Sequence, residues 1–516
     1  MDKYQEIMKE LIKQDPQTKD EFLELKKKLS GQHNLAPVTN ATLIKAYSQI
    51  GIKKDLKLNN FLMKRRTRTL SGVTPLTVLT MPYDCPGNCI YCPLEPGMPK
   101  SYLSNEPAAQ RAKLNNFDPA KQVIMRIKAL KANGHEVDKI ELLILGGSFN
   151  AYPKKYQKQF IKSCFDTCNE KGSENLEEAF KLNESVEHRI IGITIETRPD
   201  LINEEEIKWF RDLGVTRIQM GVQHLDNEIL EFVKRGHTEK EVIKATYLLK
   251  QTGFKIDYHL MPDLPTSTPR KDLKMFKEIF KNEAYKPDQI KIYPTVISEY
   301  APLYKLYQEG KHEPYSEKQL LKLLLKIKLL IPSYVRVNRL IRDIPKESII
   351  AGNSITNLRQ YLQKELIRKN KKCKCIRCRE ARENVKNIKI AKLFEEKYRA
   401  SQGTEYFISY ESKNKDKIYS FIRFRINDTK DNFIPELQNA TLIRELHTYG
   451  QLVTVDSKKS NIQHIGFGKR LIKIAEEKTK KLDYNKIAII SGIGVRPYYE
   501  KLGYSLEGTY MVKYLN

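Results

Sequence analysis

Three cysteines within eight residues are the first feature of this sequence that could carry out chemistry. Cys85, Cys89 and Cys92 lie in the segment "DCPGNCIYCP". A structural zinc site takes four ligands, and the neighbouring residues supply no fourth cysteine or histidine. A disulfide uses only two thiols and does not persist in a reducing compartment. A four-iron, four-sulfur (4Fe-4S) cluster held by three thiolates keeps one iron open to bind and reduce a small molecule, and the spacing favours this interpretation.

A second group of cysteines forms the pattern CxCxxC in "KKCKCIRCRE". Cys373, Cys375 and Cys378 offer three soft ligands between lysines and arginines, and zinc is the simplest metal for them. A fourth ligand would have to come from elsewhere in the chain, and three reduced thiols without a metal are the alternative. Cys164 and Cys168 lie four residues apart in a segment of helical periodicity, so we expect both to pack inside a helix interface.

The first cysteine group follows the first of six segments that are apolar and rich in β-branched residues. The six predicted strands are 76–82, 140–147, 190–197, 217–223, 255–262 and 289–295. Segments with helical periodicity separate them, and several of these end in glycine, the usual helix stop. Repeated strand–helix units with continuous apolar strands indicate a parallel sheet covered by helices, either doubly wound or a barrel.

Polar residues and glycines gather where these strands end. Parallel strands bind ligands at their carboxyl ends, so we expect these residues to surround one site. The strand-end residues are the cysteine loop, Gly146, Gly147, Ser148, Glu196, Arg198, Gln223, His224 and residues 259–263.

The last third of the chain has a different pattern. Residues 405–411, 417–426 and 441–450 alternate as in an antiparallel meander. The segment "QHIGFGKRLIKIAEEKTKKL" (463–482) then leads from a glycine-containing turn directly into an amphipathic helix. Free amides at a helix start, approached closely through glycine, form a site for a pyrophosphate.

Length and composition bound the functional class. With 516 residues, two or three domains are expected. No apolar run reaches the roughly 18 residues that a membrane span needs. The N-terminus is amphipathic and lacks the apolar core of a secretory signal. We therefore predict a cytoplasmic protein without a membrane span, whose eight cysteines serve metal or redox chemistry rather than disulfides.

The charge balance predicts a polyanionic partner. The formal net charge is +28, and the isoelectric point is about 9.5. Residues 364–399 carry fourteen Lys or Arg against five Asp or Glu, and "KRRTR" (64–68) is a second basic segment. Nucleic acid is the partner that such a protein most often meets, whereas a solvated basic face is the alternative for either segment alone.

These motifs resemble known families. The pattern CxxxCxxC after the first strand of a (β/α)6 run is similar to the radical S-adenosylmethionine (radical SAM) superfamily. The QxxGxG turn before a helix, followed by "VRPYYEKLGY", resembles the acetyl-CoA motif of the GNAT acetyltransferase fold. From about residue 60 onward, "NEPAAQRAKLNNFDP", "IGITIETRPD", "MPDLP", "IKIYPT" and "RELHTYG" resemble the Elongator catalytic subunits and their stand-alone bacterial and archaeal relatives.

The resemblance implies an α/β protein, with a partial (β/α)6 radical SAM barrel followed by a GNAT-type α+β domain. The implied divisions are a basic N-terminal helical tRNA-binding region (1–70), the radical SAM domain (71–345), a basic linker with the CxCxxC metal site (346–400) and the acetyltransferase domain (401–516).

The implied activity is the formation of 5-carboxymethyluridine at the wobble position of tRNA. Acetyl-CoA and S-adenosylmethionine are consumed, with a 4Fe-4S cluster and zinc as further groups. Implied partners are the tRNA anticodon stem-loop, an external electron donor and, as a candidate assembly, a second copy of the chain. A lysine N-acetyltransferase with a structural cluster and a tRNA-binding scaffold are the two rival functions.

The resemblance also implies roles for individual residues. Lys139, His447 and Tyr499 are predicted to be catalytic. The predicted contacts on the S-adenosylmethionine side are Gly146, Gly147, Ser148, Glu196 and Gln223. The predicted acetyl-CoA contacts are Lys139, Glu445, Leu446, His447, Thr448, Gln463, Gly466, Phe467, Gly468, Lys469, Arg470 and Tyr499.

Overall fold

The protein is described here from a computed structural model. It describes residues 2–52, 55–63, 72–355, 357–381, 390–449 and 466–515. The basic segment 64–68, part of the basic linker (382–389) and Gln463 lie outside the described residues.

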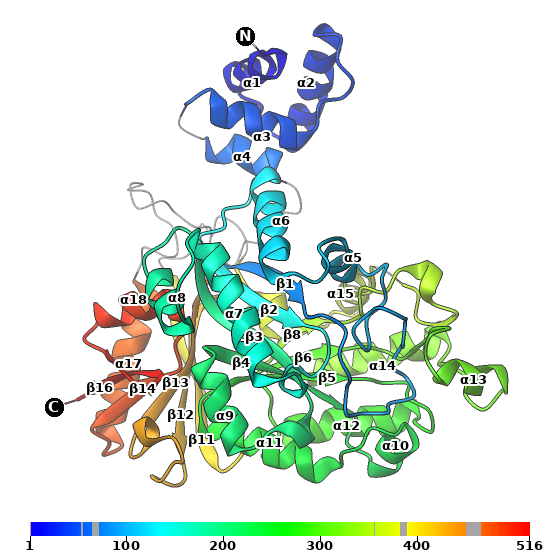
Figure 1. Cartoon of the computed structure of the whole chain (residues 1–516), viewed down its shortest axis with the longest axis vertical. Helices are drawn as coiled ribbons and strands as arrows, with labels where there is room; N and C mark the ends of the chain where they lie inside the picture. The colour runs from blue at the N-terminus through cyan, green and yellow to red at the C-terminus, as the bar shows by residue number, and fades with distance from the viewer. Residues whose placement is uncertain are drawn as a thin grey trace.

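The first sheet has seven parallel strands in the order β1-β2-β3-β4-β5-β6-β8 (Figure 1). Its strands are β1 (Thr74–Leu79), β2 (Lys139–Leu145), β3 (Arg189–Thr197), β4 (Val215–Gln223), β5 (Lys255–Leu260), β6 (Gln289–Ile292) and β8 (Arg336–Arg339). The six strands expected from the sequence are confirmed. The seventh, β8, was not predicted, because it has only four residues and its alternate positions are charged or polar.

Helices cover the outer face of this sheet. They include α6 (Pro119–Ala132), α7 (Lys154–Asn169), α9 (Glu204–Asp212), α11 (Glu239–Gln251), α12 (Pro269–Lys281) and α14 (Glu317–Leu330). Local signals set their starts: α6 and α12 begin with proline, and a capping box of Thr238 and Glu241 starts α11. Cys164 and Cys168 are buried on α7, which confirms that they pack in the core.

The inner face of the first sheet differs from the expected pattern. The strands were expected to be continuously apolar, yet polar side chains recur at alternate positions and line a cavity. Arg217 and Gln219 of β4, Gln289 and Lys291 of β6 and Asn338 of β8 belong to this set. Their neighbours along each strand pack under the helices, so each strand has one apolar and one polar face.

The second sheet has seven strands in the order β10-β11-β12-β13-β14-β16-β15. They are β10 (Lys392–Arg399), β11 (Gly403–Glu411), β12 (Ile418–Asn427), β13 (Thr441–Thr448), β14 (Lys486–Ile489), β15 (Ser505–Glu507) and β16 (Tyr510–Tyr514). The neighbours β13 and β14 are parallel and pair only from Thr441↔Ile487 to Ile443↔Ile489. The remaining residues of β13, up to Thr448, do not pair with β14, so the two strands separate there; we call this gap in the strand pairing the notch.

Buried ion pairs join the two sheets. Arg444 of β13 lies 2.6 Å from Asp288, which precedes β6, and 2.9 Å from Glu405 of β11. Lys250 of α11 lies 3.3 Å from both of these carboxylates. All four side chains are fully buried, and one apolar core continues across both sheets. Because breaking such a buried network costs about 3–5 kcal/mol per lost partner, it helps to hold the two sheets together.

The N-terminal helices form a separate unit at the end of the molecule (Figure 1). They are α1 (Lys3–Gln14), α2 (Lys19–Gln32), α3 (Asn40–Gln49) and α4 (Leu56–Leu62). Their apolar core is their own, and α3 contacts α6 of the main body. Among the helices that the structure describes, none is both long and apolar enough to cross a membrane.

Candidate functional site: a cavity between the two sheets

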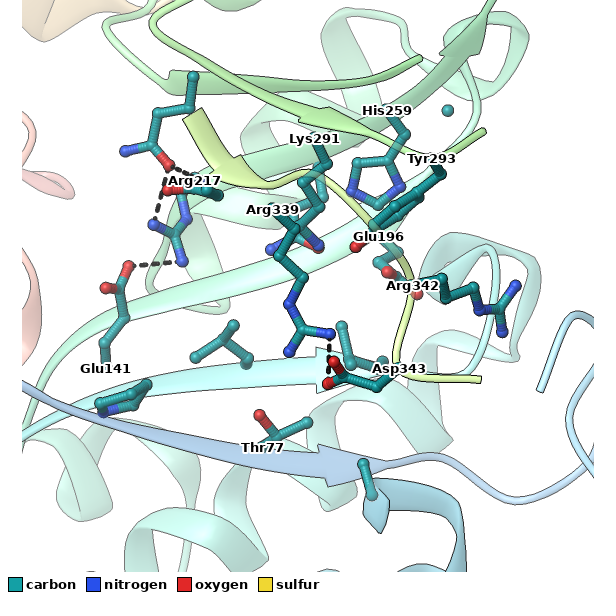
Figure 2. A pocket seen from close by; sticks show the side chains of 18 of the residues that line it. Thr77, Glu141, Glu196, Arg217, His259, Lys291, Tyr293, Arg339, Arg342 and Asp343 are labelled. Atoms are coloured by element: carbon teal, nitrogen blue, oxygen red, sulfur yellow. Dashed lines mark hydrogen bonds and ion pairs between the residues drawn. The ribbon is translucent and has the colours of Figure 1, made fainter. Parts of the chain in front are cut away.

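A cavity of about 780 Å³ runs along the inner face of the first sheet. The cysteine loop after β1 lines one end, and β13 with the residues after β14 line the other. Figure 2 shows the part in between, where side chains from several strands point toward one another. The cavity therefore connects the two regions in which the sequence predicts chemistry.

Cys85, Cys89 and Cys92 all line this cavity, as expected from their place after β1. Cys89 is only 4% exposed, and the other two are half-buried. A hydrogen bond from Cys92, together with the charge of Arg235, lowers the pKa of Cys89 although burial opposes the shift. A thiolate is the form that binds iron, so the loop suits a metal group.

The spacing of these sulfur atoms argues against a single zinc ion. Zinc bound at about 2.3 Å to each sulfur of a tetrahedron brings the sulfurs within about 4 Å of one another. Within the described ranges, Cys373, Cys375 and Cys378 are the one group of three or more candidate ligands whose atoms all lie within 4.8 Å. The loop cysteines are more open, and they fit the larger 4Fe-4S cluster.

Two glycines let the end of β2 approach the end of β1. Gly146 has a φ of 129°, and a Cβ atom there would overlap Thr80 Oγ1. Gly147 has a φ of 98° and lines the cavity together with Ser148. Only glycine adopts these conformations without strain, so the sequence places backbone without a side chain beside the cysteine loop.

Glu196 and Gln223 also line the cavity at the strand ends. Glu196 accepts a hydrogen bond of 2.6 Å from the Tyr102 hydroxyl. Gln223 has a φ of 67°, and its buried Oε1 has no hydrogen-bond partner in the described part of the chain. The structure therefore brings together the predicted cysteines, glycines, Glu196 and Gln223, and it leaves a free acceptor facing them.

Charged side chains that the sequence analysis did not single out occupy the middle of the cavity (Figure 2). Arg217 lies 2.9 Å from Glu141, and Lys291 donates a 2.5 Å hydrogen bond to Gln219 Oε1. Lys255 lies 3.8 Å from Glu445 of the second sheet. Alternation of polar residues along the predicted strands was the signal that could have identified them.

The predicted residues of β13 lie at the far end of the cavity. Glu445, Leu446 and His447 line it together with Tyr499. Burial alone would raise the pKa of Glu445, but Lys255 and Arg423 lower it to about 2. Glu445 is therefore a carboxylate at neutral pH.

Unlike the charged Glu445, the side chains of His447 and Tyr499 are neutral at neutral pH. Burial lowers the pKa of His447 to about 4, with Glu445 opposing and Arg336 and Lys255 reinforcing the shift. The buried His447 Nε2 has no hydrogen-bond partner among the described residues. Burial raises the pKa of Tyr499 well above its usual value. This end of the cavity thus combines a free neutral imidazole with a protonated phenol.

The predicted pyrophosphate turn lies beside the cavity rather than in it. Gly466 has a φ of 74° and starts α17 (Phe467–Lys481), whose first amides have no side-chain cap. A Cβ on Gly468 would lie 3.7 Å from Thr448 Oγ1 and 3.8 Å from Leu446 Cδ2. Because Leu446 lines the cavity, the turn and the cavity share one wall.

The remaining turn residues divide between core and surface. Phe467 is buried and stacks on Tyr410, with ring centroids 4.4 Å apart. Lys469 and Arg470 are exposed in the first turn of α17. They present positive charge at the helix N-terminus, which is where an anion binds.

Lys139 does not lie with the other predicted catalytic residues. It begins β2, is half-buried and is not among the residues that line the cavity. Burial lowers its pKa, with Asp138 opposing the shift. In the sheet it pairs with Arg189, and a Cβ on Gly494, in the short 3-10 helix (Ile493–Val495) after β14, would lie 2.7 Å from Arg189 Cβ. Lys139 therefore lies close to the border between the sheets.

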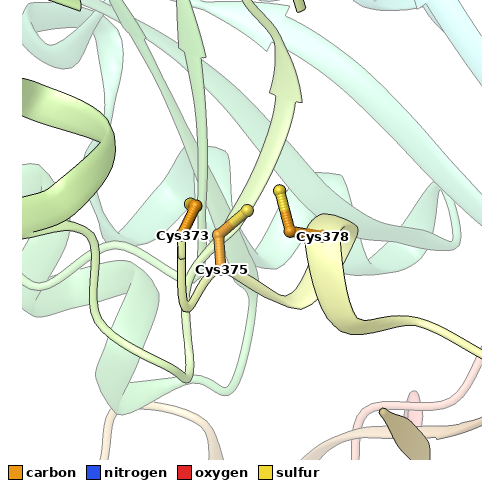
Figure 3. Close-up of side chains that lie close together, drawn as sticks. All are labelled: Cys373, Cys375 and Cys378. Carbon is orange, nitrogen blue, oxygen red and sulfur yellow. The ribbon is translucent and has the colours of Figure 1, made fainter. Parts of the chain in front are cut away.

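The linker cysteines form a compact group (Figure 3). Cys375 is fully buried, and Cys373 is 8% exposed. Lys328 of α14 places its Nζ 3.4 Å from Cys378 Sγ and 3.7 Å from Cys375 Sγ. Three soft sulfurs at this spacing fit a zinc ion, and Lys328 supplies a buried positive charge next to them.

Family models match the first sheet and the segment after it. The model of the Radical SAM superfamily matches residues 79–277, and that of the Radical_SAM C-terminal domain matches residues 287–368.

Relatives match nearly the whole chain. A protein of Methanocaldococcus jannaschii named tRNA uridine(34) acetyltransferase is 44% identical over 470 residues, which cover 88% of this chain and 86% of the relative. Elongator complex protein 3 of Schizosaccharomyces pombe is 36% identical, covering 99% of this chain and 97% of that protein. A solved structure of Methanocaldococcus infernus Elp3 with an N-terminal deletion has a TM-score of 0.77 and 39% identity, covering 86% of this chain and 100% of that chain.

Proposed function

This chain belongs to the family of the tRNA uridine(34) acetyltransferases and Elongator complex protein 3, and we propose on that basis that it forms 5-carboxymethyluridine at the wobble position of tRNA. One observation carries the proposal. A single cavity reaches from the cysteine loop to the notch between β13 and β14. An acetyl group held at one end can therefore meet radical chemistry at the other without leaving the protein.

The reaction needs the acetyl group and the radical chemistry in one cavity because the carbon atom that reacts is the acetyl methyl carbon. Uracil C5 must bond to the acetyl methyl carbon, whose hydrogens are too weakly acidic for an ordinary side-chain base. A 4Fe-4S cluster on Cys85, Cys89 and Cys92, with S-adenosylmethionine, supplies one-electron chemistry that removes a hydrogen atom from such a carbon. The electron comes from an external donor.

The residues of the second sheet hold and release the thioester. The first amides of α17, with Lys469 and Arg470, bind the pyrophosphate of acetyl-CoA. The pantetheine arm lies along β13, so that the acetyl group enters the cavity through the notch. Tyr499 keeps its proton at neutral pH, so its hydroxyl donates a hydrogen bond to the departing CoA thiolate and stabilises the charge there.

Hydrolysis of the thioester leaves the carboxylate of the product. His447 accepts a proton from the attacking water, because its imidazole is neutral and its Nε2 has no other partner in the described chain. Glu445 remains charged and anchors Lys255 and Arg423 beside it. The two ends of the cavity therefore have separate tasks, hydrogen abstraction and acyl release.

The basic regions bind the tRNA, and the linker cysteines bind zinc. The N-terminal helices and the linker contribute to a net charge of +28, which suits the phosphates of an anticodon stem-loop. Zinc at Cys373, Cys375 and Cys378 joins the linker to α14 through Lys328. A homodimer is a candidate assembly.

A lysine N-acetyltransferase is less consistent with this geometry. Such an enzyme presents its acetyl group to a side chain of another protein. Here the predicted acetyl-CoA residues of β13 and Tyr499 line the same cavity as the cysteine loop. The acetyl group would thus face the radical site.

Isotope labelling tests the proposal. The protein is reconstituted anaerobically with iron and sulfide and is given a reductant, S-adenosylmethionine, tRNA and acetyl-CoA carrying carbon-13 in the methyl group. We expect the label in the carbon attached to uridine C5, detected by mass spectrometry of the nucleosides. Cys89→Ala is the negative control. If the added carbon comes from the methyl group of S-adenosylmethionine instead, the proposal is wrong.

A further inference from the structure

Two buried arginines meet at the cysteine loop. Arg235, which follows α10 (Asn227–Phe232), is 5% exposed, and its Nη1 donates to Cys89 Sγ at 3.5 Å. Its Nη2 donates to the backbone oxygen of Gly221 at 2.5 Å, which fixes the plane of the guanidinium. Arg235 therefore points at a cluster ligand from within the core.

Arg198, at the end of β3, holds Arg235 from the other side. It is 3% exposed, and its Nη2 donates to the backbone oxygen of Arg235 at 2.7 Å. A Cβ on Gly87, between two of the cysteines, would overlap Arg198 Nη1, and a Cβ on Gly236 would lie 3.0 Å from Nη2. The guanidinium fits between these two glycines, so their lack of side chains is what admits a cation here.

Protein carboxylates balance only one charge of this pair. Asp200 lies 3.0 Å from Arg198 Nε, but in the described chain Arg235 has no carboxylate within ion-pair distance. His237, close by, is neutral, because burial and the two arginines lower its pKa to about 2, so it neither adds to nor offsets their positive charge. A buried cation without an anion is costly, so the anion that completes this site is the group on the cysteines.

We propose that Arg235, held by Arg198, raises the reduction potential of the 4Fe-4S cluster and so allows a low-potential one-electron carrier to reduce it. The inference rests on the cluster of the proposed function. Reduction adds one electron and one negative charge to the cluster, and no bond is made or broken. A hydrogen bond and a positive charge at Cys89 stabilise the reduced form more than the oxidised form, and burial weakens screening of this interaction.

Potentiometric titration of the reconstituted full-length protein, followed by electron paramagnetic resonance, tests the proposal. The titration is done without S-adenosylmethionine, acetyl-CoA or tRNA. For Arg235→Gln we expect at least a tenfold shift of the redox equilibrium toward the oxidised cluster, which is 59 mV for one electron. Arg235→Lys keeps the charge and recovers most of the shift.

Lys234→Gln is the matched control. Lys234 is the preceding residue, is exposed and carries the same charge, so solvent screens its effect on the cluster. Its midpoint potential is expected to equal that of the unaltered protein. If Arg235→Gln fails to hold the cluster, Arg198→Gln gives the same test with a smaller shift of the same sign.

Two results would overturn the inference. One is an unchanged potential in both arginine variants. The other is an unchanged potential in Arg235→Gln alone together with a weakened affinity for S-adenosylmethionine in a separate binding measurement, which would make Arg235 a ligand of its carboxylate. The titration tests only the redox inference, because it needs no acetyl-CoA or tRNA, and the carbon-13 experiment tests only the proposed function. Either hypothesis can therefore be contradicted while the other stands. A wild-type protein that forms no 4Fe-4S cluster would refute both.

Discussion

The two cysteine groups of this molecule have similar sequences and different surroundings. Each has three thiols in a short segment, and each has a buried cation within 3.7 Å of a sulfur. The three sulfur atoms of the linker group all lie within 4.8 Å of one another. Those of the loop group are more widely spaced and line the cavity. Cysteine spacing thus indicates how many thiolates are present, and the fold decides what fits between them.

The difference has a local cause. In the linker, Cys375 is the N-cap of α16 (Ile376–Arg379), and this short helix turns Cys378 back toward it. The loop after β1 has no helix to close it. Instead, Ile90 bonds through its backbone to Val233 and Leu303, which spreads the loop across the strand ends. A closed group suits one ion, and a spread group suits a larger cluster.

Replacing one loop cysteine gives the largest expected effect. Cys89→Ser should lose the iron and all cleavage of S-adenosylmethionine, because two thiolates do not hold a cluster with one open iron. Zinc at the linker should remain. Metal analysis and chromatographic measurement of 5′-deoxyadenosine check both points. Cleavage at the wild-type rate would end the assignment of this loop.

Replacing one linker cysteine should remove zinc and leave the iron in place. Cys375→Ser should lose zinc, keep iron and destabilise the fold by about 1.5–3 kcal/mol, because the buried Lys328 loses one of its two sulfur partners and keeps only Cys378. Metal analysis and denaturant unfolding measure these effects. Loss of both metals together would show that the groups are not independent.

The end of the cavity that holds His447 should respond to acid. The pKa of His447 is about 4 in the folded chain and about 6.5 when unfolded, so between these values only the unfolded chain binds the proton. Its contribution to stability is complete above about pH 6.5 and falls toward pH 4, by up to about 3 kcal/mol.

His447→Gln removes this titration. Unfolding free energies of this variant should therefore depend less on pH between about 4 and 6.5 than those of the unaltered chain. The metal content of the variant should be normal. An unchanged pH slope would mean that His447 is charged or solvated in the fold.

The smallest expected effect is on zinc binding, and it comes from replacing Lys328, the buried cation beside the linker cysteines. Lys328→Met should weaken zinc binding by about 10- to 100-fold, as is typical of residues that support metal ligands. Lys326→Met, on the exposed face of the same helix, is the control. Competition with a zinc chelator measures both. Equal affinities would leave Lys328 without a role at the metal.

The sequence predicts those features that depend on neighbours in the chain. Strand periodicity and strand ends identified six strands of the first sheet and the placement of Cys85, Gly147, Glu196 and Gln223 around one cavity. The helix start at Gly466 was recognisable for the same reason.

Features that depend on distant segments were not predictable. Lys328 lies 47 residues from Cys375, and Arg235 lies 146 residues from Cys89. Nothing in their local sequence distinguishes them from the many solvated cations of this chain. The role of Lys139 at acetyl-CoA stays a prediction, because Lys139 lies outside the cavity lining, as do Lys469 and Arg470 of the predicted pyrophosphate turn.

The ion pairs between the sheets have a consequence for how this protein can change over time. Lys250 of α11 and Asp288 before β6 come from the part of the chain that builds the first sheet and its helices, and Glu405 and Arg444 are strand residues of the second sheet. A chain cut near residue 400 would leave unmatched charges and a bare apolar face on both pieces. Neither half could be inherited, exchanged or engineered as an independent module, so substitutions along this seam have to be made in complementary pairs.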